Sequence, residues 1–229
     1  IRDVERSRGL GDVYKRQPKG YLQRLRDICD KHGILLIFDE VITGWGRTGS
    51  PFASQAFGVT PDIMTMAKAV TNGVVPLGAV ASRENIYDTV LDASPMGAVE
   101  FFHGYTYSAI PVSMAAGLAM QNIIEKENLF QRSKDMSPYF LDGLFSLKDI
   151  DVITDIRGYG MLGGIDIRFD ERPGKAGYTC FKKLFEAGLS LKATADCLIV
   201  APPFICEKEH IDEIIEKLRT GITNYMKSK

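Results

Sequence analysis

The amino-acid sequence predicts an α/β protein in which a sheet domain precedes a smaller α+β domain. Residues 34–41 begin with five large apolar residues and end with two carboxylates and a valine. Five apolar residues suit a buried strand better than a helix, because helices need more length. A strand that is apolar on both faces is typical of a covered, mostly parallel sheet. After Asp149 the pattern changes to short strands joined by glycines, which indicates the second domain.

The elements of the first domain follow from apolar spacing and turn residues. An apolar period of three and four residues predicts an amphipathic helix over residues 21–32, which Gly33 ends. A loop with three glycines follows the first strand. The further elements that we expect are strands at residues 63–67 and 77–82 and helices at residues 108–125 and 130–147.

The ends of the chain differ from its middle. Roughly half of residues 1–17 are charged and they show no apolar period, so we expect a disordered or foreign tail. Residues 18–150 form the expected sheet domain, and residues 151–229 the smaller one. The smaller domain is expected to hold strands near 151–157, 161–167, 189–192 and 197–201 and helices near 178–187 and 207–226.

The composition excludes several classes of protein. The chain has 229 residues and a net charge of -1, so it offers no general field for nucleic acid or an anionic membrane. No apolar run reaches the length of a bilayer-spanning helix. The four cysteines lie far apart, without a CxxC pair or zinc-ligand spacing. We therefore expect buried free thiols, no metal site and a cytoplasmic protein.

Two charged side chains stand at the ends of neighbouring expected strands. Asp39 ends the first strand and Lys68 ends the second. In a parallel sheet both side chains converge on the edge where ligands bind. A structural ion pair is one interpretation. A second is pyridoxal phosphate chemistry, which needs a lysine for the Schiff base and a carboxylate that keeps the pyridinium nitrogen protonated.

A P-loop ATPase is another interpretation of the same strand. An apolar strand followed by Asp39 and Glu40 also describes a Walker B element, in which the aspartate holds magnesium and the glutamate positions water. That interpretation requires a GxxxxGK[ST] run, and the sequence contains none. It would hold only for a fragment whose P-loop lies upstream.

The residues of several motifs favour the pyridoxal phosphate interpretation. Order and spacing over some forty residues resemble the signature of class III aminotransferases. Further motifs look most like the β-alanine–pyruvate (ω-amino acid–pyruvate) branch of that family. The motifs that carry the first resemblance are residues 38–49, 61–63, 67–73 and 76–79, and those that carry the second are residues 100–108, 155–160 and 172–175.

The resemblance implies a fold and a set of site residues. The fold would be type I of the PLP-dependent transferases, with residues 18–150 as the C-terminal part of the large mixed-sheet domain. Lys68 would be the catalytic Schiff-base lysine, and Asp39 would hold the pyridinium nitrogen. Val41 would press on one ring face, although core packing is the alternative. Thr106 would bind the cofactor phosphate across the interface of a homodimer or dimer of dimers, although a turn role is the alternative.

The sequence departs from the family in two respects. The family carries a long upstream half with a phosphate loop, so we expect a C-terminal fragment that alone binds pyridoxal phosphate poorly or not at all. Relatives usually place a substrate-binding arginine where this sequence has Lys192. Lysine keeps the charge but loses the bidentate fork, which favours weaker carboxylate binding or substrates without a carboxylate. A solvated surface lysine is the alternative. We also expect Glu40 to pair with Arg47 as a loop scaffold.

These residues together imply an enzyme that transfers amino groups between a small amine and an oxo acid. β-Alanine as donor and pyruvate as acceptor are the preferred pair. A diamine, taurine or 4-aminobutanoate are alternative donors within the same family. A fragment of a P-loop ATPase with Asp39 and Glu40 as Walker B is the alternative from another class.

Overall fold

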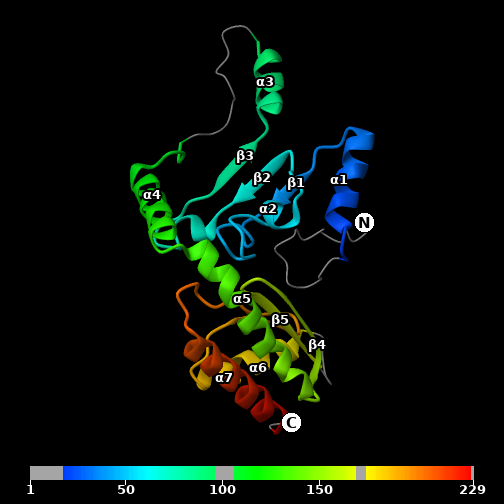
Figure 1. The fold of residues 1–229 in the computed structure, drawn as a ribbon, viewed down its shortest axis with the longest axis vertical. Coiled ribbons are helices and arrows are strands. Elements are labelled where there is room, and N and C mark those ends of the chain that lie inside the picture. Colours follow the sequence, from blue (N-terminus) through cyan, green and yellow to red (C-terminus); the bar gives the residue numbers. More distant parts are fainter. Residues whose placement is uncertain (1–17, 96–105, 169–173, 228–229) are drawn as a thin grey trace. The chain divides into compact units, whose positions relative to one another are not determined.

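The computed structural model describes residues 18–95, 106–168 and 174–227 (Figure 1). The tail 1–17 and most of the motif at residues 100–108 lie outside the described residues. The described chain forms two compact units. The first holds Pro18–Trp45 and Phe52–Asn128, and the second holds Gly46–Pro51 and Leu129–Lys229. Helix α5 (Leu129–Phe145), which we expected in the first domain, thus belongs to the second unit.

The first unit is built on a small mixed sheet. Strands β1 (Ile37–Asp39) and β2 (Ile63–Met66) run parallel, and β3 (Ala79–Ser82) pairs antiparallel with β2 (Figure 1). Helix α1 (Tyr21–His32) has the predicted bounds and ends where Gly33 adopts a φ of 62°. It buries Leu22 and Cys29 against the sheet.

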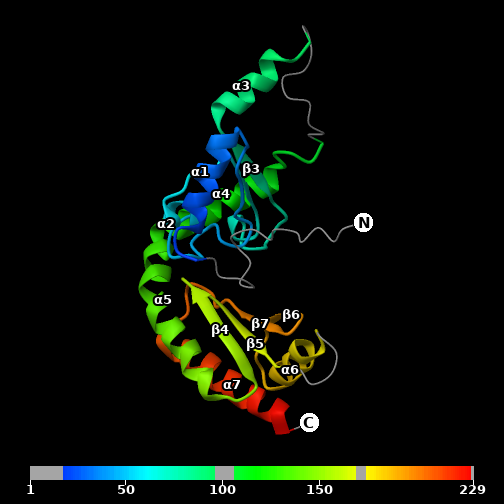
Figure 2. The same ribbon diagram turned by 90° about the vertical axis from the view of Figure 1, so that its right-hand side faces the viewer.

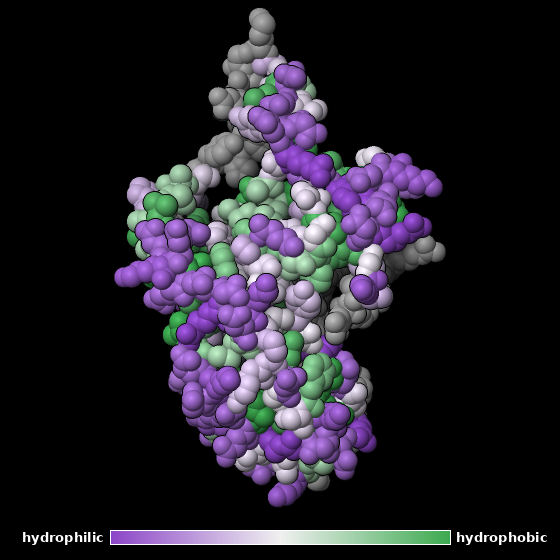
Figure 3. Space-filling model, viewed as in Figure 1, coloured by the Kyte–Doolittle hydropathy of each residue, from purple (hydrophilic) through white to green (hydrophobic). Residues whose placement is uncertain are grey.

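Only one face of β1 is covered by the described residues. Leu36 and Phe38 are buried, whereas Leu35 and Ile37 are 53% and 56% exposed. Successive side chains of a strand point to opposite faces, so α1 covers one face alone. The prediction that this strand is buried on both faces is therefore wrong for this chain. Figure 3 shows hydrophobic residues at the surface of this unit among hydrophilic ones.

Several short elements of the first unit escaped prediction. They are α2 (Ala53–Phe57), the 3-10 helix η1 (Lys68–Val70) and α3 (Glu84–Asp92). The predicted helix at residues 108–125 is α4 (Pro111–Lys126), with proline in its first turn, where it has no hydrogen bond to lose.

A mostly buried ion pair ties α1 to the sheet. Arg26 donates to Asp62 Oδ2 at 2.7 Å, and the Leu36 N–H donates to the same oxygen at 2.7 Å. Burial alone would raise the pKa of Asp62, but the Leu36 N–H and the Arg26 cation outweigh it and hold that pKa below its ordinary value. The stability that Asp62 contributes is therefore present above the ordinary pKa and is lost as the pH falls through the lowered one.

We expect Asp62→Asn to lower the free energy of unfolding by about 2 kcal/mol near neutral pH, since Arg26 loses its buried partner. Urea unfolding at several pH values measures the change, and the loss should shrink in acid. Asp30→Asn is the matched control, because Asp30 pairs with the same Arg26 from an exposed position. An equal loss in both variants would contradict the importance of the buried pair.

The second unit is an antiparallel sheet packed against three helices. The strands are β4 (Ile153–Tyr159), β5 (Leu162–Ile167), β6 (Lys192–Thr194) and β7 (Cys197–Val200), in the order β4-β5-β7-β6. Helix α7 (Lys208–Lys227) contacts both α5 and α6 (Lys175–Glu186), as Figure 2 lets the reader follow. The 3-10 helix η2 (Ser146–Asp149) links α5 to β4. The fully buried core includes Phe140, Leu144, Leu198, Ile211 and Leu218.

The cysteines are free thiols, as predicted. Cys29, Cys180 and Cys197 are buried, whereas Cys206 is only partly buried. Burial raises the pKa of Cys180 and of Cys197 to about 12, so both stay protonated near neutral pH. Among the described residues, no helix is both long and apolar enough to cross a membrane.

Candidate functional site

Strands β1 and β2 bring Asp39 and Lys68 to the same edge of the sheet. The two strands are parallel, with Asp39 opposite Thr65, and Lys68 follows the end of β2. The carboxyl ends of parallel strands meet at one edge, where open sheets of this kind bind ligands. Both side chains are exposed there. The predicted placement of the carboxylate and the amine at the ends of neighbouring parallel strands is confirmed.

Hydrogen bonds to one of its two oxygens orient the Asp39 side chain. The Val41 N–H donates to Asp39 Oδ1 at 3.0 Å, and the Thr65 hydroxyl donates to the same oxygen at 3.4 Å. Neither of these bonds uses Oδ2. The carboxylate is thus held through Oδ1 with its second oxygen left to accept a further proton donor. Val41, which supplies the first of these bonds, is half-buried directly after the strand.

Lys68 has an unusual backbone. Its φ is 55°, in the left-handed region, and it opens the 3-10 helix η1. This region costs a residue with a Cβ about 1 kcal/mol or more. Such costs often collect at functional sites, where the surrounding structure holds a side chain in one position.

The backbone of Lys68 gives a stability test with a defined sign. We expect Lys68→Gly to be more stable than Lys68→Ala by about 1 kcal/mol, because glycine adopts positive φ without a steric cost. Thermal unfolding of the two variants measures the difference. Lys182 lies inside helix α6, so Lys182→Ala should there be more stable than Lys182→Gly. The same order of stability at both positions would contradict the strain at Lys68.

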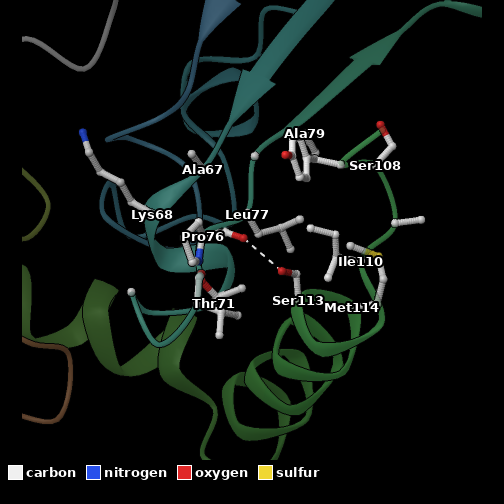
Figure 4. Close-up of a pocket in the computed structure, with 15 residues that line it drawn as sticks. Ala67, Lys68, Thr71, Pro76, Leu77, Ala79, Ser108, Ile110, Ser113 and Met114 are labelled. Atoms are coloured by element: carbon white, nitrogen blue, oxygen red, sulfur yellow. Dashed lines mark hydrogen bonds between the residues drawn. The ribbon is translucent and has the colours of Figure 1, made fainter. Parts of the chain in front are cut away.

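Lys68 also lies beside a pocket of about 980 Å³. Its walls come from residues 67–79, after β2, and from residues 107–114, which lead into α4. The Ser113 hydroxyl joins the two walls by donating to the Pro76 carbonyl at 3.0 Å. Figure 4 shows the Lys68 amine directed away from Leu77, Ile110 and Met114. The apolar part of the pocket and the amine therefore lie in different directions from the Lys68 backbone.

Thr106 stands at the start of the second pocket wall. Its side chain is exposed, and the residues that follow it, Tyr107 and Ser108, line the pocket. Sequence reasoning singled out Thr106 but not these two neighbours. Their hydroxyl groups, directly after Thr106, are the signal that would have marked them as polar groups of the pocket wall.

Glu40 and Arg47 do not form the expected pair. Glu40 is fully buried, and its carboxylate accepts hydrogen bonds from the Thr43 hydroxyl and from the N–H groups of Ala53 and Ser54. Arg47 instead donates to the carbonyls of Met161 and Pro202 and lies over the Phe204 ring. Burial lowers the pKa of Arg47 to about 10. The prediction of a Glu40–Arg47 pair is wrong, because backbone groups bind both side chains.

The burial of Glu40 also speaks against a Walker B role. That role needs a glutamate that reaches a water molecule beside a bound nucleotide. A carboxylate that is fully buried and bonded to backbone N–H groups has no such access. Among the described residues, no group of three or more histidine, cysteine, aspartate or glutamate side chains is arranged to hold a metal ion.

Lys192 lies in the second unit. It begins strand β6, opposite Ile199, and its side chain is exposed. The strand predicted at residues 189–192 is displaced, because Gly188 follows α6 in the left-handed conformation and the Leu189 N–H still bonds to Leu184. Exposure on an edge strand is compatible both with binding of a substrate carboxylate and with a solvated surface lysine.

Comparison with known proteins places these residues in a family. Residues 4–222 match the family described as Aminotransferase class-III. The chain is 48% identical over 205 residues to an omega-aminotransferase from Caulobacter vibrioides and 47% identical over 201 residues to a beta-alanine–pyruvate aminotransferase from Pseudomonas aeruginosa. These matches cover 88% and 87% of this chain but 46% and 45% of the relatives, so the chain spans about half of their length.

Solved structures give the same result. A mutant of a thermostable omega transaminase from Pseudomonas jessenii superposes with a TM-score of 0.86 at 30% identity, over 91% of this chain and 48% of that one. An (S)-enantioselective omega-transaminase from Thermomicrobium roseum gives a TM-score of 0.84 at 34% identity, over 91% and 47%. The chain therefore belongs to the class III aminotransferase family and has the α/β fold of type I PLP-dependent transferases.

Proposed function

We propose that the gene product containing this chain is a PLP-dependent aminotransferase that transfers the amino group of an ω-amino donor to pyruvate. The placement of Asp39 and Lys68 at the ends of adjacent parallel strands is the observation that carries the proposal. Relatives named as omega-aminotransferase and beta-alanine–pyruvate aminotransferase support β-alanine as the preferred donor.

The residues at this edge fit pyridoxal phosphate. Asp39 offers a carboxylate whose Oδ1 is already held, so Oδ2 is available to a protonated ring nitrogen. Lys68 offers an exposed primary amine at the same sheet edge for the cofactor aldehyde. When bound, the cofactor supplies an electron sink for the electron pair released at the carbon that bears the amino group.

Each residue then has a defined task. Asp39 keeps the ring nitrogen protonated, because a carboxylate stabilises a charged donor more strongly than a neutral acceptor does. Lys68 would hold the cofactor through Nζ, and once the donor amine has taken its place, the freed Nζ would move a proton to and from the reacting carbon. Val41, directly after the strand, would pack on one face of the bound ring. Core packing alone is the other role for Val41.

Thr106 is proposed to act on a second copy of the chain. In a homodimer or a dimer of dimers, its hydroxyl would donate to the cofactor phosphate of the partner subunit. Thr106 is exposed and directly precedes Tyr107 and Ser108, which line the pocket, and this position supports the assignment. We also propose a cytoplasmic enzyme, which the free cysteines support.

Lys192 is proposed to bind the substrate carboxylate. We expect Lys192→Ala to raise KM for pyruvate by about tenfold with a smaller change in kcat, since a charged hydrogen bond contributes about 1.5 kcal/mol or more. Steady-state kinetics on the full-length gene product measure both constants. Lys183→Ala, which removes a lysine of helix α6 in the same unit, is the control. Unchanged kinetics in Lys192→Ala would assign Lys192 to the solvated surface.

Product analysis on the full-length gene product tests the function. Purified protein with pyridoxal phosphate should convert β-alanine and pyruvate into malonate semialdehyde and alanine. Parallel assays with a diamine, taurine and 4-aminobutanoate rank the alternative donors. ATP hydrolysis is measured in the same samples as a check on the P-loop alternative. Alanine formation from none of these donors would overturn the proposal.

A further inference from the structure

Glu40 is a buried carboxylate that the proposed chemistry does not use. Its side chain is fully buried, directly after Asp39 at the end of β1. Three donors bind it: the Thr43 hydroxyl at 2.5 Å and the Ala53 N–H at 2.9 Å share Oε2, and the Ser54 N–H binds Oε1 at 2.7 Å. A buried charge with this many bonds is well satisfied without a cation.

These bonds hold both ends of a loop. Thr43 lies in the turn that leaves β1, whereas Ala53 and Ser54 form the first turn of helix α2. The N–H groups at a helix start are free of internal partners and favour a negative charge. The Gly44 N–H also donates to the Glu40 carbonyl at 2.9 Å. Glu40 thus closes the turn after β1 through its backbone and through its side chain.

The same turn orients Asp39. The Glu40 N–H donates to the Thr65 carbonyl at 2.8 Å, and the next N–H, that of Val41, donates to Asp39 Oδ1. The direction of the Asp39 carboxylate therefore depends on where the turn places Val41. We propose that Glu40 is a positioning residue whose buried carboxylate fixes this turn and thereby aims Asp39 at the pyridinium nitrogen. This inference depends on the proposed function.

A glutamine cannot replace Glu40 without conflict. Both carboxylate oxygens accept a backbone N–H, one from Ala53 and one from Ser54. Whichever way the amide of Glu40→Gln is turned, its NH₂ group faces one of these donors. Shape is retained while one backbone hydrogen bond is lost. The variant thus tests the charge and the bonding of Glu40 with little change in packing volume.

The experiment compares two variants of the full-length gene product, each of which replaces a carboxylate that accepts two backbone N–H groups by an amide. Asp196 is the matched control, because its carboxylate also accepts two N–H groups at a helix start, those of Gly174 and Ala176 at α6. For Glu40→Gln we expect about a tenfold rise in the dissociation constant of pyridoxal phosphate, the effect of losing about one charge-assisted hydrogen bond. The pH midpoint of the bound-cofactor absorbance should also shift. Asp196→Asn should lower Tm similarly and leave both cofactor readouts unchanged.

The outcomes separate the inference from the proposed function. A cofactor dissociation constant and pH midpoint that Glu40→Gln leaves at the wild-type values, with Tm lowered as in Asp196→Asn, would overturn the positioning role. If Glu40→Gln does not fold, Thr43→Val removes one of the three bonds and should weaken cofactor binding by a few-fold. An unchanged dissociation constant in Thr43→Val would overturn the role as well. A wild-type protein that binds no pyridoxal phosphate would instead overturn the proposed function.

Discussion

Lys68→Ala should lower the rate of transamination by about 10⁴-fold or more in the full-length gene product. The substitution removes both the covalent attachment of the cofactor and the group that moves the proton, and general acid–base catalysis alone contributes up to about 10⁴-fold. Alanine formation from β-alanine and pyruvate measures the loss. The visible absorbance of lysine-bound pyridoxal phosphate should disappear in the same protein.

A matched lysine shows whether the loss is specific. Lys182 is an exposed lysine inside helix α6 of the second unit, so Lys182→Ala should keep its activity and its absorbance band. Added primary amines should restore part of the proton transfer in Lys68→Ala, since they supply the missing base. Full activity in Lys68→Ala would remove Lys68 from the reaction.

Asp39→Asn should lower kcat by about 10²–10³-fold, the usual effect of removing one electrostatic contact to the reacting group. The amide oxygen can still accept the Val41 N–H, because that bond uses Oδ1, so the side chain keeps its direction. The amide lacks the negative charge that keeps the ring nitrogen protonated. The variant therefore isolates charge from geometry.

Single-turnover rates of the half-reaction with β-alanine measure the effect of Asp39→Asn on chemistry apart from product release. Asp88→Asn serves as the control, because Asp88 is an exposed aspartate of helix α3 in the same unit. A wild-type single-turnover rate in Asp39→Asn would exclude the proposed contact with the ring nitrogen.

Local patterns predicted the elements whose ends are set by their own residues. Helix α1 has its predicted bounds because its apolar period is regular and Gly33 takes the left-handed conformation after it. The end of helix α7 lies within one residue of the prediction for the same reason of periodicity. Asp39 and Lys68 were found because an apolar run that stops at a charged residue marks the end of a strand.

Features that depend on distant residues were not predictable in this way. The burial of Glu40 depends on Ala53 and Ser54, the first turn of a helix too short to show an apolar period. Arg47 binds carbonyls that are more than a hundred residues away in sequence. No local pattern states which partner a charged side chain finds when the partner is a backbone group.

The half-covered strand β1 has a practical consequence for work with this chain in isolation. Ile34, Leu35 and Ile37, at the start of this strand and just before it, are each more than half exposed. Contiguous apolar surface of this kind promotes association between copies. We therefore expect a preparation of the isolated 229-residue polypeptide to self-associate. Its light scattering should rise steeply with protein concentration and with ammonium sulfate, which strengthens apolar association.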